Sequence, residues 1–221
     1  MKGRRLTRAD RLISRHPADA NFNPVAKRYP RRACLILVMG VAGSGKTTLA
    51  KKILRQIGAT YLDNNHIVDA FFPDTRSGRS YERLRPYFYR ALYNIVEENL
   101  RLDNSVLLDV PHVKEMQNPD WRRFIRKLAA RARAKLVVIR CFCSEPTLQA
   151  RLRSRAEMRD RSKLVHWKRF LTEQPIDVVL SVPHLDVDTE KSSARNVARS
   201  VQYILSAGST RKGENWQVQP D

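Results

Sequence analysis

The chain has 221 residues, with 42 basic against 22 acidic side chains and a formal net charge of +20. This length suits one sizeable α/β domain and is short for two. No apolar run approaches the roughly 18–20 residues that a membrane-spanning helix needs, and the charged N-terminus lacks the apolar core of a secretory signal. Such a positive surface attracts polyanions, which include phosphorylated substrates, nucleic acid and anionic membranes.

The three cysteines, Cys34, Cys141 and Cys143, all fall in apolar runs typical of strands. We expect them to be buried, reduced thiols, because no Cys-x-x-Cys spacing or Cys/His cluster could form a zinc site. Reduced thiols in turn predict a cytoplasmic location.

In chain order, residues 1–32 predict a basic extension that is mobile or loosely docked. They hold ten basic residues against two acidic ones, with three prolines and little apolar periodicity. A segment of this composition cannot bury enough apolar surface to fold alone. The polar residues 208–221 predict a disordered tail, which leaves residues 33–207 as the folded domain.

Within that domain, short apolar runs alternate with amphipathic stretches. Strands are expected at 33–39, 60–62, 105–108, 135–143 and 184–187. Helices are expected at 47–57, 81–102, 119–133, 145–155, 164–172 and 190–205. Alternation of this kind indicates a parallel sheet with right-handed crossovers. We therefore predict an α/β fold, a three-layer α/β/α sandwich with a mostly parallel five-stranded sheet, whose ligands bind beyond the carboxyl ends of the strands.

A complete phosphate-binding motif follows the first strand. Gly40-Val41-Ala42-Gly43-Ser44-Gly45-Lys46-Thr47 matches G-x-x-x-x-G-K-[ST], and Thr48 follows it. Glycines let the backbone N–H groups turn toward phosphate oxygens, and the next helix adds its positive dipole end. Lys46 is expected to reach the β- and γ-phosphates, and the Thr47 hydroxyl to bind Mg²⁺. The motif predicts a P-loop NTPase that binds a nucleoside triphosphate, such as ATP, with Mg²⁺.

Other P-loop classes lack support. No Asn-Lys-x-Asp follows a later strand, no Glu follows Asp109, and no Leu-Ser-Gly-Gly occurs, which argues against GTPases, ring ATPases and transporter ATPases. From about Cys34 to Leu205 the chain resembles small P-loop kinases of the zeta-toxin and chloramphenicol-phosphotransferase-like group. Gluconate kinases and polynucleotide 5′-kinases are similar relatives. The likeness comprises the P-loop, an acid after each of the second and third strands, and an arginine-rich lid after the fourth.

The resemblance implies that an Asp after the second strand takes the proton from an acceptor hydroxyl, often within Asp-x-Asp. Asp63 fits the first acid, whereas Asn65 stands at the second. Asp63 is therefore the expected base; if it binds metal instead, Asp69 or His66 is the alternative. A helix-capping role is the competing interpretation of Asp63.

Asp109 and three arginines complete the expected site. Asp109 ends an apolar strand like a Walker B acid, so it is expected to hold Mg²⁺ with Thr47. Binding of substrate and a capping role are its alternatives. The resemblance implies that Arg151 lies over the nucleobase, that Arg155 contacts phosphate, and that Arg159 belongs to a lid over the γ-phosphate. Positioned positive charge of this kind is the main source of catalysis in phosphoryl transfer.

These residues together predict a kinase that transfers the γ-phosphate of ATP to a hydroxyl of a small metabolite. Two alternatives stay open. The basic charge favours a nucleic-acid 5′-hydroxyl kinase or RNA-repair enzyme, and Asn65 would fit a nucleotide-binding regulatory switch with slow hydrolysis.

Overall fold

The computed structural model describes residues 26–72 and 78–209. Its sheet has five strands in the order β2-β3-β1-β4-β5. They are β1 (Cys34–Met39), β2 (Thr60–Asp63), β3 (Val106–Asp109), β4 (Lys135–Phe142) and β5 (Leu185–Asp188). All four neighbouring pairs are parallel, so the sheet predicted to be mostly parallel is parallel throughout.

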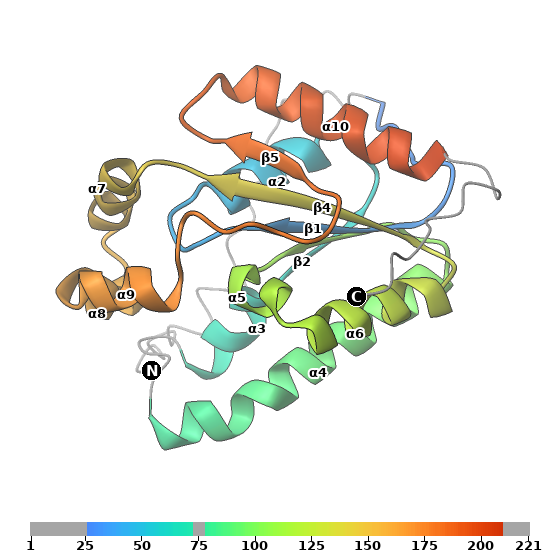
Figure 1. Ribbon diagram of the computed structural model, residues 1–221. Coiled ribbons are helices and arrows are strands. Elements are labelled where there is room, and N and C mark those ends of the chain that lie inside the picture. The colour runs from blue at the N-terminus through green and yellow to red at the C-terminus, as the bar shows by residue number, and fades with distance from the viewer. Residues whose placement is uncertain (1–25, 73–77, 210–221) are drawn as a thin grey trace, which may run out of the picture.

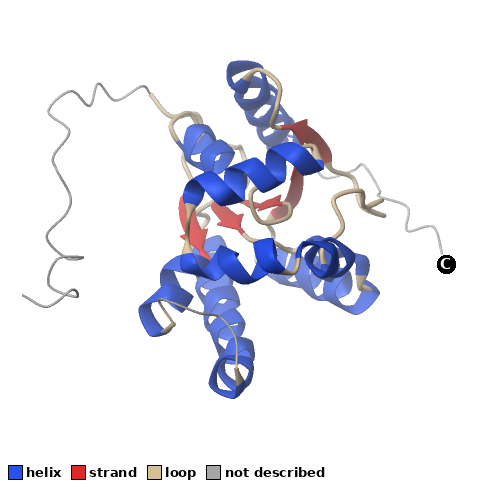
Figure 2. Cartoon of the chain, turned by 90° about the vertical axis from the view of Figure 1, so that its left-hand side faces the viewer, coloured by secondary structure: helices blue, strands red, loops and turns tan. Residues whose placement is uncertain are grey.

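Helices cover both faces of the sheet (Figure 1), which confirms the α/β/α sandwich. One face carries α2 (Lys46–Leu54) and α10 (Ser193–Ser209), and the other carries α4 (Arg79–Arg101) and α6 (Pro119–Arg131). Shorter helices follow the carboxyl ends of the strands: α3 (Asn64–Phe71), α5 (Val113–Gln117), α7 (Glu145–Arg155), α8 (Met158–Val165) and α9 (Trp167–Glu173). Figure 2 views the molecule from the side of α7, α8 and α9, with helices around the strands.

The central strand β1 supplies both hydrophobic cores, because side chains alternate across a strand. The core under α4 and α6 receives Leu35, Leu37 and Met39. The core under α2 and α10 receives Cys34, Ile36 and Val38. A strand covered on both faces has no solvent side, and this explains its uninterrupted apolar sequence. The three cysteines are buried and free, as expected, and burial raises the pKa of Cys34 to about 11.

Several boundaries differ from the sequence-based expectations. Helix α2 ends at Leu54, before the expected end at residue 57. The ring of Tyr29 lies over Gly58, where an added Cβ would be 2.0 Å from that ring. The helix expected near 164–172 is divided into α8 and α9 at His166. Helix α5 was not expected, and α3 was implied only by the capping interpretation of Asp63.

Part of the expected N-terminal extension is docked on the domain. The N–H of Arg28 donates to the carbonyl of Gln56 at 2.8 Å, and the N–H of Gly58 donates to the carbonyl of Arg28 at 2.9 Å. Pro30 packs against Gly208. Residues 1–25 of that extension and residues 210–221 of the expected tail lie outside the described part of the chain. None of the described helices is long and apolar enough to cross a bilayer.

Candidate nucleotide and phosphoryl-transfer site

The loop between β1 and α2 has the backbone shape of an anion site. Gly43 and Gly45 have φ values of 86° and 87°, in the left-handed region that favours glycine. At Gly40 an added Cβ would lie 2.3 Å from the carbonyl oxygen of Cys141, so β4 leaves no room for a side chain. Turned N–H groups at the start of α2 form a concave site for phosphate oxygens.

Lys46 lies between an acid and a second cation. Its Nζ donates to the carbonyl oxygen of Val41 at 3.0 Å. Burial lowers the pKa of Lys46, the charge of Asp109 opposes that change, and the charge of Arg155 adds to it. A desolvated cation near another cation favours an anionic ligand, since a phosphate would stabilise both charges.

Thr47 and Asp109 offer a pair of oxygen ligands. The Thr47 hydroxyl donates to Oδ2 of Asp109 at 2.5 Å, and Asp109 is only 3% exposed. Burial raises the pKa of Asp109, although Lys46 and Thr47 oppose this change. Among the described residues no cluster of three or more His, Cys, Asp or Glu could hold a metal. Two oxygens, with water and phosphate completing the shell, are what Mg²⁺ usually takes from a protein.

Asp63 stands beside Asp109 on the neighbouring strand, and the two are register partners. The Tyr61 hydroxyl lies 3.3 Å from Oδ2 of Asp63 and 3.1 Å from Oδ2 of Asp109. Burial and both carboxylates raise the pKa of Tyr61, so this hydroxyl keeps its proton and donates it. Oδ1 of Asp63 accepts the N–H of Asn65 at 2.8 Å, which caps α3. Asp63 therefore caps a helix with one oxygen and faces the site with the other.

The two alternative bases have other surroundings. His66 is exposed and packs edge-on to Tyr61, with the ring centroids 5.9 Å apart. Asp69 accepts a hydrogen bond from Arg159 at 2.8 Å. Arg159 also pairs with Glu157, so the structure directs this lid arginine toward α3.

A cavity of about 430 Å³ opens beside the P-loop, a volume within the usual range for small-molecule sites. Its lining comes from the P-loop, α2, α7, the segment after β5 and the start of α10: Gly43, Gly45, Lys46, Thr47, Thr48, Leu49, Lys52, Arg151, Arg155, Thr189, Lys191, Ser193 and Asn196. Five of these side chains are cationic and none is acidic. The cavity therefore suits a polyphosphate with an attached base.

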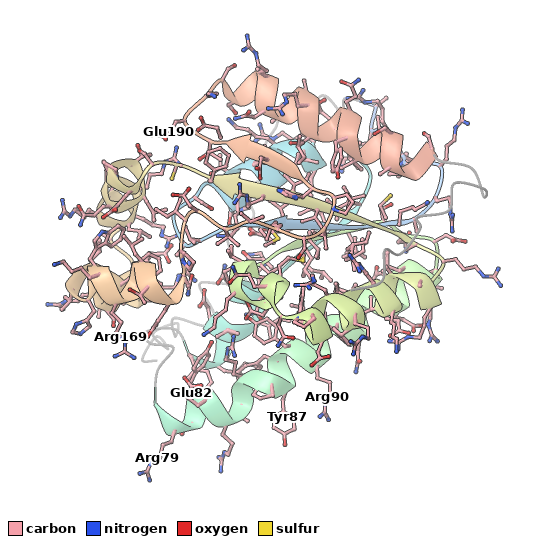
Figure 3. The ribbon with its side chains drawn as sticks, viewed as in Figure 1. Arg79, Glu82, Tyr87, Arg90, Arg169 and Glu190 are labelled. Atoms are coloured by element: carbon pink, nitrogen blue, oxygen red, sulfur yellow. The ribbon has the colours of Figure 1, made fainter. Side chains whose placement is uncertain are left out.

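One wall of the cavity joins α7 to the segment after β5. Arg151 donates to the hydroxyl of Thr189 at 2.8 Å and to its carbonyl at 3.0 Å. Glu190 accepts the N–H and the hydroxyl of Ser144, both at 2.8 Å, and also pairs with Thr147; it lies near the end of β5 in Figure 3. The sequence predicted that ligands bind beyond the carboxyl ends of the strands but gave no role to Thr189.

Arg155 reaches the cavity, held by a fully buried acid. Nε of Arg155 donates to Asp160 at 2.8 Å, and Nζ of Lys163 donates to the other oxygen of Asp160 at 2.8 Å. Asp160 is 0% exposed. Burial alone would raise the pKa of Asp160, but Lys163 and Arg155 outweigh it and lower that pKa. Sequence reasoning missed Asp160. Arg159, unlike Arg155, is absent from the cavity lining.

A polar cluster follows β3 on the side of α4. His112 is 1% exposed, its Nε2 lies 2.8 Å from the Tyr93 hydroxyl, and Trp121 donates to that hydroxyl at 3.3 Å. Arg85 pairs with Glu115 at 3.3 Å. By contrast, Arg79, Tyr87 and Arg90 point outward from α4 in Figure 3. Among the arginines of α4, Arg85 is thus the one that joins this cluster.

Comparisons with solved structures agree with this architecture. A candidate kinase from Chloroflexus aurantiacus superimposes with a TM-score of 0.59 at 22% identity, covering 78% of this chain and 98% of that one. Kti12 of Chaetomium thermophilum, solved with ADP-AlF3, superimposes with a TM-score of 0.56 at 20% identity, covering 80% of this chain and 100% of that one. A gluconokinase from Sinorhizobium meliloti superimposes with a TM-score of 0.53 at 19% identity, covering 81% of this chain and 94% of that one. At such identities the likeness shows the fold, that of P-loop kinases.

A comparison with curated protein sequences finds no match. Residues 35–175, more than half of the chain, match the family model described as an AAA domain. With its P-loop, parallel sheet and kinase-like architecture, the chain belongs to this AAA domain family.

Proposed function

We propose that the protein is a kinase that transfers the γ-phosphate of ATP to a hydroxyl group of a small metabolite. One observation carries the proposal. A single tyrosine hydroxyl, that of Tyr61, lies within 3.3 Å of both Asp63 and Asp109, and Asp109 is bonded to Thr47 of the P-loop. The carboxylate of Asp63, the register partner of Asp109, thus stands beside the residues suited to hold the phosphates.

The P-loop residues Gly40 to Thr48 would bind the triphosphate through backbone N–H groups and Lys46. Arg151 would lie over the nucleobase at the wall that it forms with Thr189. Thr47 and Asp109 would hold Mg²⁺, which when bound neutralises phosphate charge and fixes the phosphate oxygens.

Asp63 would accept the proton of the acceptor hydroxyl as that oxygen attacks the γ-phosphate. General-base catalysis of this kind contributes about 10²–10⁴-fold. Arg155, oriented by Asp160, would stabilise the negative charge that develops on the transferred group. Arg159 would complete the lid if it exchanged Asp69 for phosphate.

The finer assignment is to the zeta-toxin and chloramphenicol-phosphotransferase-like group. It is supported by the P-loop, by acids at the ends of β2 and β3, and by arginines on α7 and α8. Asn65 is the departure from that pattern. The proposal takes residues 33–207 as the kinase domain, and it includes a cytoplasmic location, supported by the three free thiols.

The test is incubation of the full chain with γ-labelled ATP and Mg²⁺, together with a metabolite extract or with oligonucleotides bearing 5′-hydroxyls. Label on a small metabolite supports the proposal. Label only on oligonucleotides would reassign the acceptor, and label only in inorganic phosphate would indicate a nucleotide switch.

A further inference from the structure

One face of the molecule carries no carboxylate among the described residues that form it. It is formed by α2 with the residues after it, by α10, and by the docked N-terminal segment. Residues 26–33, 46–59 and 193–209 contain neither Asp nor Glu. Their exposed cations are Lys27, Arg28, Arg31, Lys51, Arg55, Arg195 and Arg199. We call this surface the basic face.

These three segments form one continuous surface. Lys52 on α2 donates to the hydroxyl of Ser193 on α10 at 2.7 Å. Arg28 pairs with Gln56 just after α2, both through the backbone and through a side-chain bond of 3.0 Å. Pro30 touches Gly208 near the end of α10, and Figure 1 shows α2 and α10 on the same side of the sheet. Their positive charges therefore act together.

The charges of the basic face are also unneutralised. The side chains of Lys51, Arg55, Arg195 and Arg199 have no hydrogen bond or ion pair with any residue of the described ranges 26–72 and 78–209. On the opposite side of the sheet, by contrast, some of the exposed cations form ion pairs.

On that opposite side, acids pair with two of the four arginines of α6. Arg123 pairs with Asp120 at 2.9 Å, and Arg131 pairs with Glu97 at 2.9 Å. Arg122 donates to backbone carbonyls. The basic composition of α6 is thus partly balanced, whereas that of α2 and α10 is not.

We infer that the basic face binds a nucleic-acid strand through its phosphodiester backbone. Arginine, the commonest exposed cation here, matches phosphate oxygens with a planar fork of N–H donors. Tyr29 is 72% exposed on this face and offers a ring on which a base can stack. Nucleic-acid binding at this face would be a further function, separate from phosphate transfer.

The apolar content favours nucleic acid over an anionic membrane. A helix that lies on a membrane inserts large apolar side chains between the lipids. Eight of the nine large apolar side chains exposed in the described residues lie outside the basic face; Tyr29 is the exception. The basic face thus offers charge with little to insert into hydrocarbon.

The test compares two double variants of the full chain, each of which lowers the net charge by four. Arg195→Glu with Arg199→Glu alters the basic face. Arg126→Glu with Lys127→Glu alters exposed cations of α6 and is the matched control. Binding of a fluorescent 20-nucleotide RNA is measured by anisotropy at several salt concentrations, and binding of ADP with Mg²⁺ reports that each variant is folded.

We expect the basic-face variant to bind RNA at least about tenfold more weakly, with the log–log salt slope reduced by about 1.4 for two lost phosphate contacts. The control should stay within about twofold of the wild type. Equal losses in both variants, or no RNA binding by the wild type, would refute the inference. Binding to phosphatidylserine vesicles in place of RNA, lost in the same variant, would reassign the face to membranes.

Discussion

Nη1 of Arg159 lies 2.8 Å from Oδ2 of Asp69, so an ion pair joins α8 to α3. This pair links two residues that sequence reasoning had placed in separate roles, one in a lid and one as an alternative base. A carboxylate that holds an arginine is less available as a proton acceptor than one that faces a tyrosine hydroxyl. We therefore expect loss of the Asp63 carboxylate and loss of the Asp69 carboxylate to have different effects on the rate of phosphate transfer.

Asp63→Asn should lower kcat by at least about 10²-fold with little change in nucleotide affinity. Asparagine still caps helices well, so α3 should remain intact. The measurement is phosphate transfer with labelled ATP alongside ADP binding. Asp69→Asn is the comparison, and a larger loss there than at Asp63 would move the base to Asp69.

Lys46→Ala should abolish nearly all phosphate transfer and weaken nucleotide binding, because Lys46 is the P-loop cation between Asp109 and Arg155. The melting temperature should not fall, since the substitution removes a desolvated charge. Lys51→Ala, on the outer surface of the same helix, is the matched control. Full transfer by the Lys46 variant would refute the P-loop assignment.

Arg155→Ala should lower kcat more than ground-state nucleotide affinity, because its charge acts on the group being transferred. Asp160→Asn should produce part of the same kcat defect, since Asp160 orients Arg155. Arg153→Ala, an exposed residue of the same helix, should have little effect. The measurement is kcat and nucleotide affinity for all three variants. Equal small effects in the three would indicate that Arg155 is an ordinary surface charge.

The nucleotide affinity gained from Mg²⁺ should fall as the pH is lowered. Burial raises the pKa of Asp109, so this carboxylate takes up a proton at a higher pH than the ordinary value of about 3.9, and a protonated acid holds a cation poorly. Titration of ADP with and without Mg²⁺ between pH 5 and pH 8 measures the effect. Asp109→Asn should reduce the Mg²⁺ enhancement at pH 7.5 by at least about tenfold and leave it nearly independent of pH.

A truncated protein that begins at Ala26 should melt like the full chain, whereas one that begins at Ala33 should be less stable. The second truncation removes the Arg28 backbone bonds and the Tyr29 and Pro30 contacts. Together we expect these to contribute about 1–2 kcal/mol, which corresponds to about 2–8 °C in Tm for a chain of this size. Equal melting curves would show that the docking is energetically neutral.

The sheet and the P-loop could be predicted because their signals are local. Each strand is a short apolar run. The G-x-x-x-x-G-K-[ST] motif gives the position of the loop, of the start of the helix and of the lysine within eight residues. The acids at the ends of β2 and β3 could be found for the same reason, since a carboxyl-terminal strand end marks the ligand edge.

Tyr61, Asp160 and Thr189 escaped prediction because their importance depends on partners distant in the chain or on burial. Tyr61 meets Asp109 across 48 positions, and Thr189 meets Arg151 across 38. Asp160 is close to Arg155 in sequence, but its complete burial depends on how α8 packs in the folded domain. No periodicity distinguishes such residues from ordinary polar ones.

The central place of β1 has a consequence for synthesis of the chain. Its pairing partners β3 and β4 begin about 70 and 100 residues later, so at roughly 5–20 residues per second β4 is completed about 5–20 s after β1. During that interval the stretch Cys34–Met39 is a six-residue apolar segment with no partner strand on either side. The newborn chain must therefore keep this apolar segment soluble before its central strand can pair.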